Sequence, residues 1–82
     1  MKKRGSTIKY KGVVLPLIVE KGDSHYIIEC PILEGCFTQG KTIDEALKNI
    51  REVIELVLLE KKNQDALKDY RPRELSFHTI TL

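Results

Sequence analysis

The sequence predicts an α+β fold in which an antiparallel three-stranded sheet packs on one main amphipathic helix, followed by a C-terminal strand, in the order β-β-β-α-β. Two observations lead to this prediction. Apolar residues recur at helical spacing from Ile43 onward, and runs of β-branched and aromatic residues separated by glycine-containing turns precede them. We expect residues 1–82 to form a single domain. A chain this short buries only about 60% of its unfolded surface, so we also expect a homo-oligomer, a dimer or tetramer.

The composition is that of an ordinary soluble globular protein, with 41% hydrophobic and 32% charged residues, and the net charge of +2 favours no particular partner. Two cysteines do not make a disulfide framework. The longest apolar stretch, Val13 to Val19, is interrupted by Pro16, and no run has the length of a signal peptide or membrane span. We therefore expect a cytoplasmic protein with no membrane contact.

The first six residues, 1–6, contain Lys2, Lys3 and Arg4 and have two readings. A basic arm of this kind attracts phosphate backbones, or it is a flexible, solvated tail. We favour the tail, because a basic arm without a recognition helix gives only sequence-independent attraction. Thr7 to Tyr10 is a candidate short edge strand.

Two β-rich runs, Val13 to Glu20 and His25 to Cys30, are joined by a turn at residues 21–24 and predict a hairpin. A turn closed at Gly22-Asp23 places Val19 opposite Tyr26 and Glu20 opposite His25. One face, which we expect to meet the helix, then carries Val13, Leu15, Leu17, Val19, Tyr26, Ile28 and Cys30. The other carries Val14, Pro16, Ile18 and Ile27, with Glu20, His25 and Glu29 around them, and is a candidate partner surface.

The helix is predicted from Ile43 to Glu60. Thr42 followed by Glu45 is a capping box, and Gly40 ends the short strand before it. The buried stripe contains Ile43, Ala46, Leu47, Ile50, Val53, Ile54, Val57 and Leu58. Leu56 and Leu59 fall outside this stripe. Scattered surface leucines are normal, but two large neighbours at this spacing favour a subunit interface.

After the helix, residues 61–73 form a polar connector: Lys61 to Asp65 predicts a break, and Ala66, Leu67 and Tyr70 allow a short helix. Glu74 to Leu82 reads as a final strand whose apolar phase shifts between Phe77 and Ile80. This shift indicates either a bulge or a strand that lies partly on a neighbouring subunit. Both alternatives stay open.

A motif connects the hairpin to the helix. The motif Pro-x-Leu-x-Gly-Cys, then Gly, Thr and Glu-Ala-Leu-x-Asn-Ile, resembles that of the HicB-like antitoxin family. This chain carries it as Pro31, Leu33, Gly35, Cys36, Gly40, Thr42, Glu45, Ala46, Leu47, Asn49 and Ile50. The resemblance covers roughly Val13 to Leu59. Ile32 departs from the acidic residue common after the proline.

The resemblance implies a partial ribonuclease H-like fold and an antitoxin function. A HicB-like protein binds a small basic HicA-like toxin, an mRNA-cleaving nuclease, and covers its catalytic histidine. The toxin-binding candidates are Val14, Ile18, Glu20, Asp23, His25, Ile27 and Glu29, and the oligomer-interface candidates are Leu56, Leu59, Phe77 and Ile80. The alternative is a solitary homo-oligomeric interaction domain without a toxin partner.

Many family members add a C-terminal helix-turn-helix or ribbon-helix-helix. Residues 61–82 are too few for a helix-turn-helix, and no helix follows Leu82 to complete a ribbon-helix-helix. We therefore expect a short form of the family in which DNA binding is weak or absent.

The third hypothesis is that the chain is the remnant of a nuclease and retains enzymatic activity. The predicted register places Glu20 and Glu29 roughly 13 Å apart, whereas two-metal chemistry needs ions about 4 Å apart. Cys30, Cys36, His25 and His78 lack the spacing of a zinc site, and no oxyanion feature accompanies Cys36 as a nucleophile. His78 lacks a group to orient it as a base. We therefore expect no enzyme, metal or cofactor, and read both cysteines as buried core residues.

Overall fold

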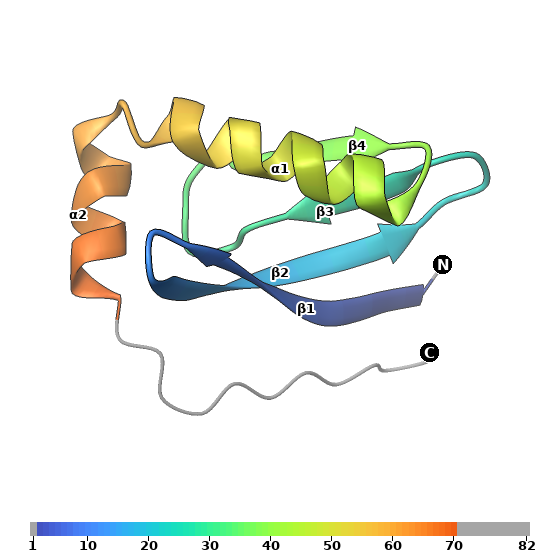
Figure 1. Cartoon of the computed structure of the whole chain (residues 1–82), viewed down its shortest axis with the longest axis horizontal. Helices are drawn as coiled ribbons and strands as arrows, with labels where there is room; N and C mark the ends of the chain where they lie inside the picture. Colours follow the sequence, from blue (N-terminus) through green and yellow to red (C-terminus); the bar gives the residue numbers. More distant parts are fainter. Residues whose placement is uncertain (1, 71–82) are drawn as a thin grey trace.

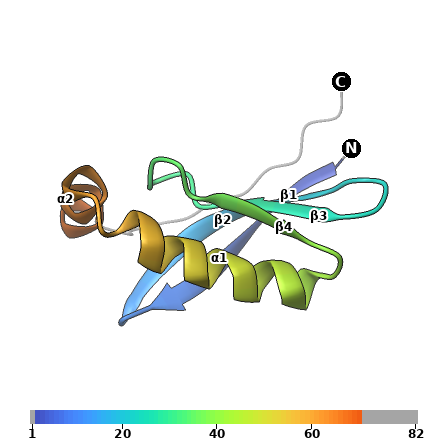
Figure 2. The same cartoon turned by 90° about the horizontal axis from the view of Figure 1, so that it is seen from above.

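The computed structural model describes residues 2–70, and six elements follow one another in this part of the chain. They are β1 (Lys2–Tyr10), β2 (Val13–Lys21), β3 (Tyr26–Glu29), β4 (Phe37–Gly40), α1 (Ile43–Val57) and α2 (Lys61–Asp69). The strands form one antiparallel sheet in the order β1-β2-β3-β4. Helix α1 lies across one face of the sheet and α2 stands at one end of α1 (Figures 1 and 2). The α+β class is confirmed, but within residues 2–70 the sheet has four strands and not three.

Strand β1 is longer than expected. Its nine residues pair with all of β2, from Lys2 opposite Lys21 to Tyr10 opposite Val13. Lys11 and Gly12 connect the strands with φ angles of 48° and 81°, and two consecutive positive φ angles are typical of the type I′ hairpin turn. The prediction of a flexible arm at the start of the chain was therefore wrong for residues 2–6, because the second half of β2 pairs with them.

The β2–β3 hairpin has a register that differs by two residues from the predicted one. Val19 lies opposite Ile28 and Lys21 opposite Tyr26, because the loop spans Gly22 to His25 and is closed by the Gly22 N–H donating to the His25 carbonyl at 2.8 Å. A shift of two residues keeps the alternation of side chains, so the predicted faces are correct although the predicted partners are not.

The inner sheet face and α1 form the core. Fully or nearly buried residues from both sides meet there: Ile8, Tyr10, Leu15, Leu17, Val19, Ile28, Cys30, Leu33, Cys36, Ala46, Ile50 and Ile54. The helix approaches β4 closely at Gly40, where an added Cβ would lie 2.9 Å from the Ala46 Cα. Only glycine at position 40 leaves room for the first turn of α1.

Helix α1 begins as predicted, with Thr42 as its N-cap. Thr42 Oγ1 accepts from the Glu45 N–H at 3.1 Å, and Glu45 Oε1 accepts from the Lys41 N–H at 3.4 Å, one residue earlier than a standard capping box requires. Two further side chains of α1 reach the edge strands: Asn49 Nδ2 donates to the Gln39 carbonyl at 2.9 Å, and Arg51 Nη1 donates to the Lys9 carbonyl at 3.2 Å. The helix is therefore attached to both edges of the sheet.

The end of α1 differs from the prediction. The helix ends at Val57 and not at Glu60, and the expected break at residues 61–65 is the first half of α2. The polar residues there complete the end of α1: Asn63 Nδ2 donates to the Val57 carbonyl at 3.1 Å, and Gln64 Nε2 donates to the Leu58 carbonyl at 2.8 Å. Carbonyls at a helix end need such partners, and side-chain amides from the next helix supply them here.

The predicted strand Glu74 to Leu82, with Phe77, His78 and Ile80, lies outside the described residues. Within residues 2–70, neither helix has the length and apolar character required to cross a membrane.

Candidate functional site

The candidate site is the sheet face opposite α1, which we call the outer sheet face. Alternation along a strand sends every second side chain to this side, while the intervening ones meet α1. Figure 2 shows that α1 lies on one side of the sheet only. The outer sheet face therefore takes no part in the packing between sheet and helix.

The observed pairing arranges this face in rows that cross all four strands. One row contains Gly5, Ile18, Glu29 and Phe37, and the next contains Lys3, Glu20, Ile27 and Gln39. Together they surround a shallow hollow of about 300 Å³, lined by Lys3, Ile18, Glu20, Ile27, Glu29 and Phe37. The hollow is thus built from side chains of four strands and depends on the register of the whole sheet.

The hollow combines exposed apolar side chains with carboxylates. Ile27 and Phe37 are 42% and 65% exposed, and Ile18 on the neighbouring strand β2 is half-buried. Glu29 lies directly beside both Ile18 and Phe37 in its row, and Glu20 lies directly beside Ile27. Apolar anchors bordered by charge are the usual composition of a protein-binding surface.

The two carboxylates are closer than the sequence suggested. Glu20 is opposite Ile27 and Glu29 is opposite Ile18, so they are diagonal neighbours on adjacent strands, a position that corresponds to about 7–8 Å. The predicted 13 Å was wrong because the register is shifted by two residues. Within residues 2–70, no group of three or more His, Cys, Asp or Glu side chains is arranged to hold a metal ion.

The structure brings together some of the predicted toxin-binding residues and separates others. Ile18, Glu20, Ile27 and Glu29 line the hollow. Val14 is on the same face but near the other end of β2, opposite Lys9, and is 38% exposed. Asp23 and His25 lie in the β2–β3 turn, where His25 Nδ1 is 2.7 Å from Ser24 Oγ. These three residues do not line the hollow.

Two residues of the hollow were missed from the sequence. Lys3 was missed because residues 2–6 read as an arm and not as a strand. Phe37 was missed because the short strand that ends at Gly40 was not assigned a place in the predicted sheet. Cys36 is 2% exposed and Phe37 is 65% exposed, so the alternation of inward and outward side chains begins here, but both residues are apolar and the sequence does not reveal it.

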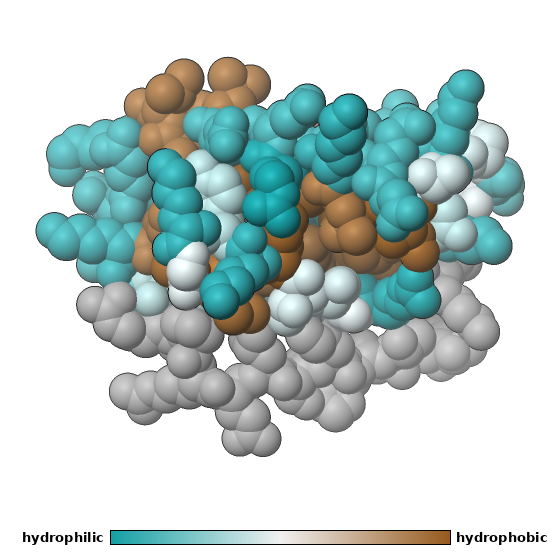
Figure 3. All heavy atoms as spheres, in the orientation of Figure 1, coloured by the Kyte–Doolittle hydropathy of each residue, from teal (hydrophilic) through white to brown (hydrophobic). Residues whose placement is uncertain are grey.

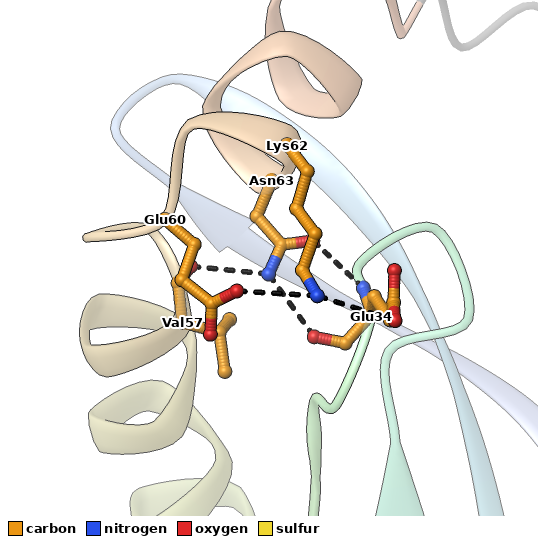
Figure 4. A network of polar contacts seen from close by, with 5 residues as sticks. All are labelled: Glu34, Val57, Glu60, Lys62 and Asn63. Atoms are coloured by element: carbon orange, nitrogen blue, oxygen red, sulfur yellow. Dashed lines mark hydrogen bonds and ion pairs between the residues drawn. The ribbon is translucent and has the colours of Figure 1, made fainter.

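A second polar arrangement positions the loop between β3 and β4, residues 31–35 (Figure 4). Asn63 in α2 is 1% exposed, accepts from the Glu34 N–H at 2.8 Å and donates to the Glu34 carbonyl at 3.0 Å, besides its bond to Val57. A single buried amide thus connects the loop, the end of α1 and α2. The sequence offered no clear signal for this role, since Asn63 stood in a run of polar residues.

An ion-pair cluster lies beside Asn63 (Figure 4). Lys62 Nζ lies 3.2 Å from Glu34 Oε1 and 3.2 Å from Glu60 Oε2, and the two carboxylates, Glu34 first, raise the pKa of Lys62. All three side chains are at least half exposed, so solvent screens the attraction and we assign the attachment of the loop chiefly to Asn63.

The predicted interface leucines lie elsewhere on the molecule. Leu56 and Leu59 are 64% and 76% exposed at the end of α1, and apolar surface gathers over the connection between α1 and α2 (Figure 3). Their predicted companions, Phe77 and Ile80, lie outside the described residues. Because α1 covers the inner face, these leucines are separated from the outer sheet face by the thickness of the molecule.

The family model described as HicB-like antitoxin of bacterial toxin-antitoxin system matches residues 15–77. A UPF0150 protein of Thermoplasma acidophilum is 41% identical over 64 residues, which is 76% of this chain and 91% of that protein. A UPF0150 protein of Synechocystis sp. is 57% identical over 44 residues, 54% of this chain and 64% of that protein. A third, from Archaeoglobus fulgidus, is 44% identical over 48 residues, 57% of this chain and 70% of that protein. No solved structure matches the chain significantly.

Proposed function

Because the chain belongs to the HicB-like antitoxins of bacterial toxin–antitoxin systems, we propose that it neutralises a small basic HicA-like toxin by covering the toxin's active site with the outer sheet face. Neutralisation of this kind is stoichiometric binding, and it needs no catalytic group on the antitoxin. The toxin would cleave mRNA when free and would be inactive in the complex.

The observation that supports this proposal is the composition of the hollow. Ile18, Ile27 and Phe37 supply apolar contact area, and Glu20 and Glu29 supply negative charge beside it. A basic toxin complements these carboxylates, which speeds association, while the apolar residues slow dissociation. Val14, Asp23 and His25 would then lie at the rim of the interface.

The test uses purified toxin, identified by affinity capture of this chain from its host at moderate salt, and measures both the dissociation constant and the inhibition of RNA cleavage. Phe37→Ala and Leu56→Ala form a matched pair, since the two side chains are 65% and 64% exposed and lie on opposite sides of the molecule. We expect Phe37→Ala to weaken binding roughly 10- to 100-fold and Leu56→Ala to leave binding unchanged.

The charge contribution is tested separately with Glu29→Gln and Glu29→Lys. The neutral variant should reduce the association rate, and the charge reversal should reduce it further, with both effects becoming smaller at high salt. Weakened binding in Leu56→Ala together with full binding in Phe37→Ala would contradict the proposed face. Failure of every purified basic candidate to bind the wild-type chain would contradict neutralisation itself.

A second candidate function is that of a solitary homo-oligomeric interaction domain, and the exposed pair Leu56 and Leu59 favours it. This function predicts a stable homodimer or homotetramer in the absence of any toxin. Replacing both leucines by serine should then convert the oligomer to a monomer in sedimentation velocity, whereas Phe37→Ala should not. A monomeric wild-type chain at micromolar concentration would exclude this second function.

A further inference from the structure

Cys30 directly follows β3 and Cys36 directly precedes β4, so the two cysteines lie opposite one another just beyond the paired strands. The β3–β4 pairing runs through Ile28 opposite Thr38 and Glu29 opposite Phe37, so the next pair is Cys30 and Cys36. The Cys30 N–H donates to the Cys36 carbonyl at 2.9 Å, which continues the ladder by one bond. Hydrogen-bonded opposite residues in antiparallel strands have Cα atoms about 5.5 Å apart, and this separation lies within the range that disulfides span.

The two thiols are not equivalent in their electrostatic surroundings. A hydrogen bond from Cys36 lowers the pKa of the Cys30 thiol, helped by the backbone N–H groups of Ile32 and Leu33 and opposed by burial. The same bond, together with burial, raises the pKa of the Cys36 thiol far above its ordinary value. Cys30 therefore ionises first, and Cys36 retains its proton beside it.

We propose that Cys30 and Cys36 are a peroxide-oxidisable pair that forms a reversible disulfide across the base of the loop at residues 31–35. This inference concerns the loop and does not depend on toxin binding. In the structure both cysteines are free thiols, each at most 2% exposed, so the structure corresponds to the reduced form. The oxidised form would covalently join the end of β3 to the start of β4.

The chemistry balances with hydrogen peroxide as the oxidant. The Cys30 thiolate attacks one peroxide oxygen, the O–O bond breaks, and the departing hydroxide takes up the Cys30 proton as water, which leaves a sulfenic acid on Cys30. The Cys36 sulfur then attacks the Cys30 sulfur, the S–O bond breaks, and the second hydroxide leaves as water with the Cys36 proton. Each peroxide thus oxidises two thiols to one disulfide and yields two waters.

Access to the buried thiols requires the loop to open, and the structure identifies what keeps it closed. Leu33 is 4% exposed beneath the loop, and Asn63 pairs with both backbone groups of Glu34. Local opening exposes groups that are buried in the average structure, and its frequency sets their reaction rate. Asn63 is thus a positioning residue that should limit the rate of oxidation.

The experiment treats the reduced, full chain with hydrogen peroxide at neutral pH and follows the intact mass and the count of free thiols after denaturation. We expect the loss of two hydrogen atoms, the loss of both thiols, a monomeric chain on a non-reducing gel, and recovery of the starting mass with a dithiol reductant. The variant Cys36→Ser should stop at a sulfenic acid on Cys30 that a dimedone-type reagent traps. Neither single variant, Cys30→Ser or Cys36→Ser, should form the intramolecular disulfide.

The role of the loop is tested with Asn63→Ala and the control Lys61→Ala, which removes an exposed ion pair on the same helix. We expect Asn63→Ala to speed oxidation of the wild-type cysteines about tenfold, and Lys61→Ala to leave the rate unchanged. If Asn63→Ala does not fold, the proposal of a reversible disulfide is decided by the peroxide treatment of the wild-type chain. Sulfinic or sulfonic acid on a single cysteine, disulfides only between chains, or two intact thiols after prolonged treatment would each overturn the proposal.

Discussion

The two faces of β2 differ although they are made by alternate residues of one strand. On the inner face Leu15 and Leu17 are fully buried and Val19 is 4% exposed. On the outer face Val14 is 38% exposed, Ile18 and Glu20 are half-buried, and Pro16 alone is buried. The inner residues belong to the core cluster that also contains Ala46, Ile50 and Ile54 of α1, while Ile18 and Glu20 on the outer face line the hollow. Neighbouring positions of β2 therefore contribute to different properties, the inner ones to stability and the outer ones to the proposed binding. Substitutions one residue apart should affect one property without the other.

The sharpest comparison is Leu17→Ala against Ile18→Ala. Leu17 is fully buried, so its truncation should lower the free energy of unfolding by about 2–5 kcal/mol, while Ile18→Ala should cost under about 1.5 kcal/mol. Denaturant titration followed by circular dichroism measures both. Equal losses for the two variants would show that the outer sheet face is also part of the folding core.

Gly40→Ala tests how closely the inner face and α1 approach each other. The new methyl group would overlap the backbone of Ala46, which has no flexible atoms that can move aside. We expect a loss of about 1–3 kcal/mol in the free energy of unfolding and changes in amide chemical shift confined to β4 and the first turn of α1. The matched variant Gln39→Ala, on the outer side, should be close to neutral.

Asn63→Ala removes the amide that joins the loop at residues 31–35 to both helices. It leaves the Glu34 backbone groups and the Val57 carbonyl without this partner, and we expect a cost of about 1–3 kcal/mol. Thermal unfolding measures the change. Asn63→Asp retains the acceptor for the Glu34 N–H but buries a charge and turns an oxygen toward the Glu34 and Val57 carbonyls, so it should cost at least as much as Asn63→Ala.

The smallest effect is expected at the start of α1. Thr42→Ala removes the side-chain acceptor of the Glu45 N–H and should cost about 1 kcal/mol, whereas Thr42→Ser should keep most of the stability. Denaturant midpoints of the two variants provide the measurement. Identical midpoints for Ala and Ser would show that sheet packing alone determines where α1 begins.

The sequence predicted the elements that depend on strong periodicity. The stripe of α1, the cap at Thr42 and the two faces of the β2–β3 hairpin all follow from residue spacing, and all are present in the structure. The hairpin register was wrong because a closure at Gly22-Asp23 and a longer loop from Gly22 to His25 give the same alternation. Only the Gly22–His25 hydrogen bond distinguishes them, and it is not visible in residue spacing.

The parts that the sequence did not predict depend on pairing between distant segments. Residues 2–6 are a strand because they pair with the second half of β2, as far as Lys21. Their own composition does not predict a strand, so the length of β1 could not be read from the sequence. Phe37 lines the hollow because β4 pairs with β3, which places it opposite Glu29. Asn63 positions the loop through hydrogen bonds to Glu34, which lies 29 residues away along the chain. A hollow assembled from four strands requires the whole register, which a local pattern does not contain.

The bonds from α1 to the two edge strands have a consequence for self-association. Edge strands expose unpaired backbone N–H and C=O groups. A strand of another molecule can pair with these groups and extend the sheet. Asn49 already occupies the Gln39 carbonyl of β4, and Arg51 already occupies the Lys9 carbonyl of β1. An incoming strand would have to displace one of these side chains at either margin. The helix that completes the core thereby also opposes edge-to-edge pairing of the sheet with other molecules at the Gln39 and Lys9 carbonyls.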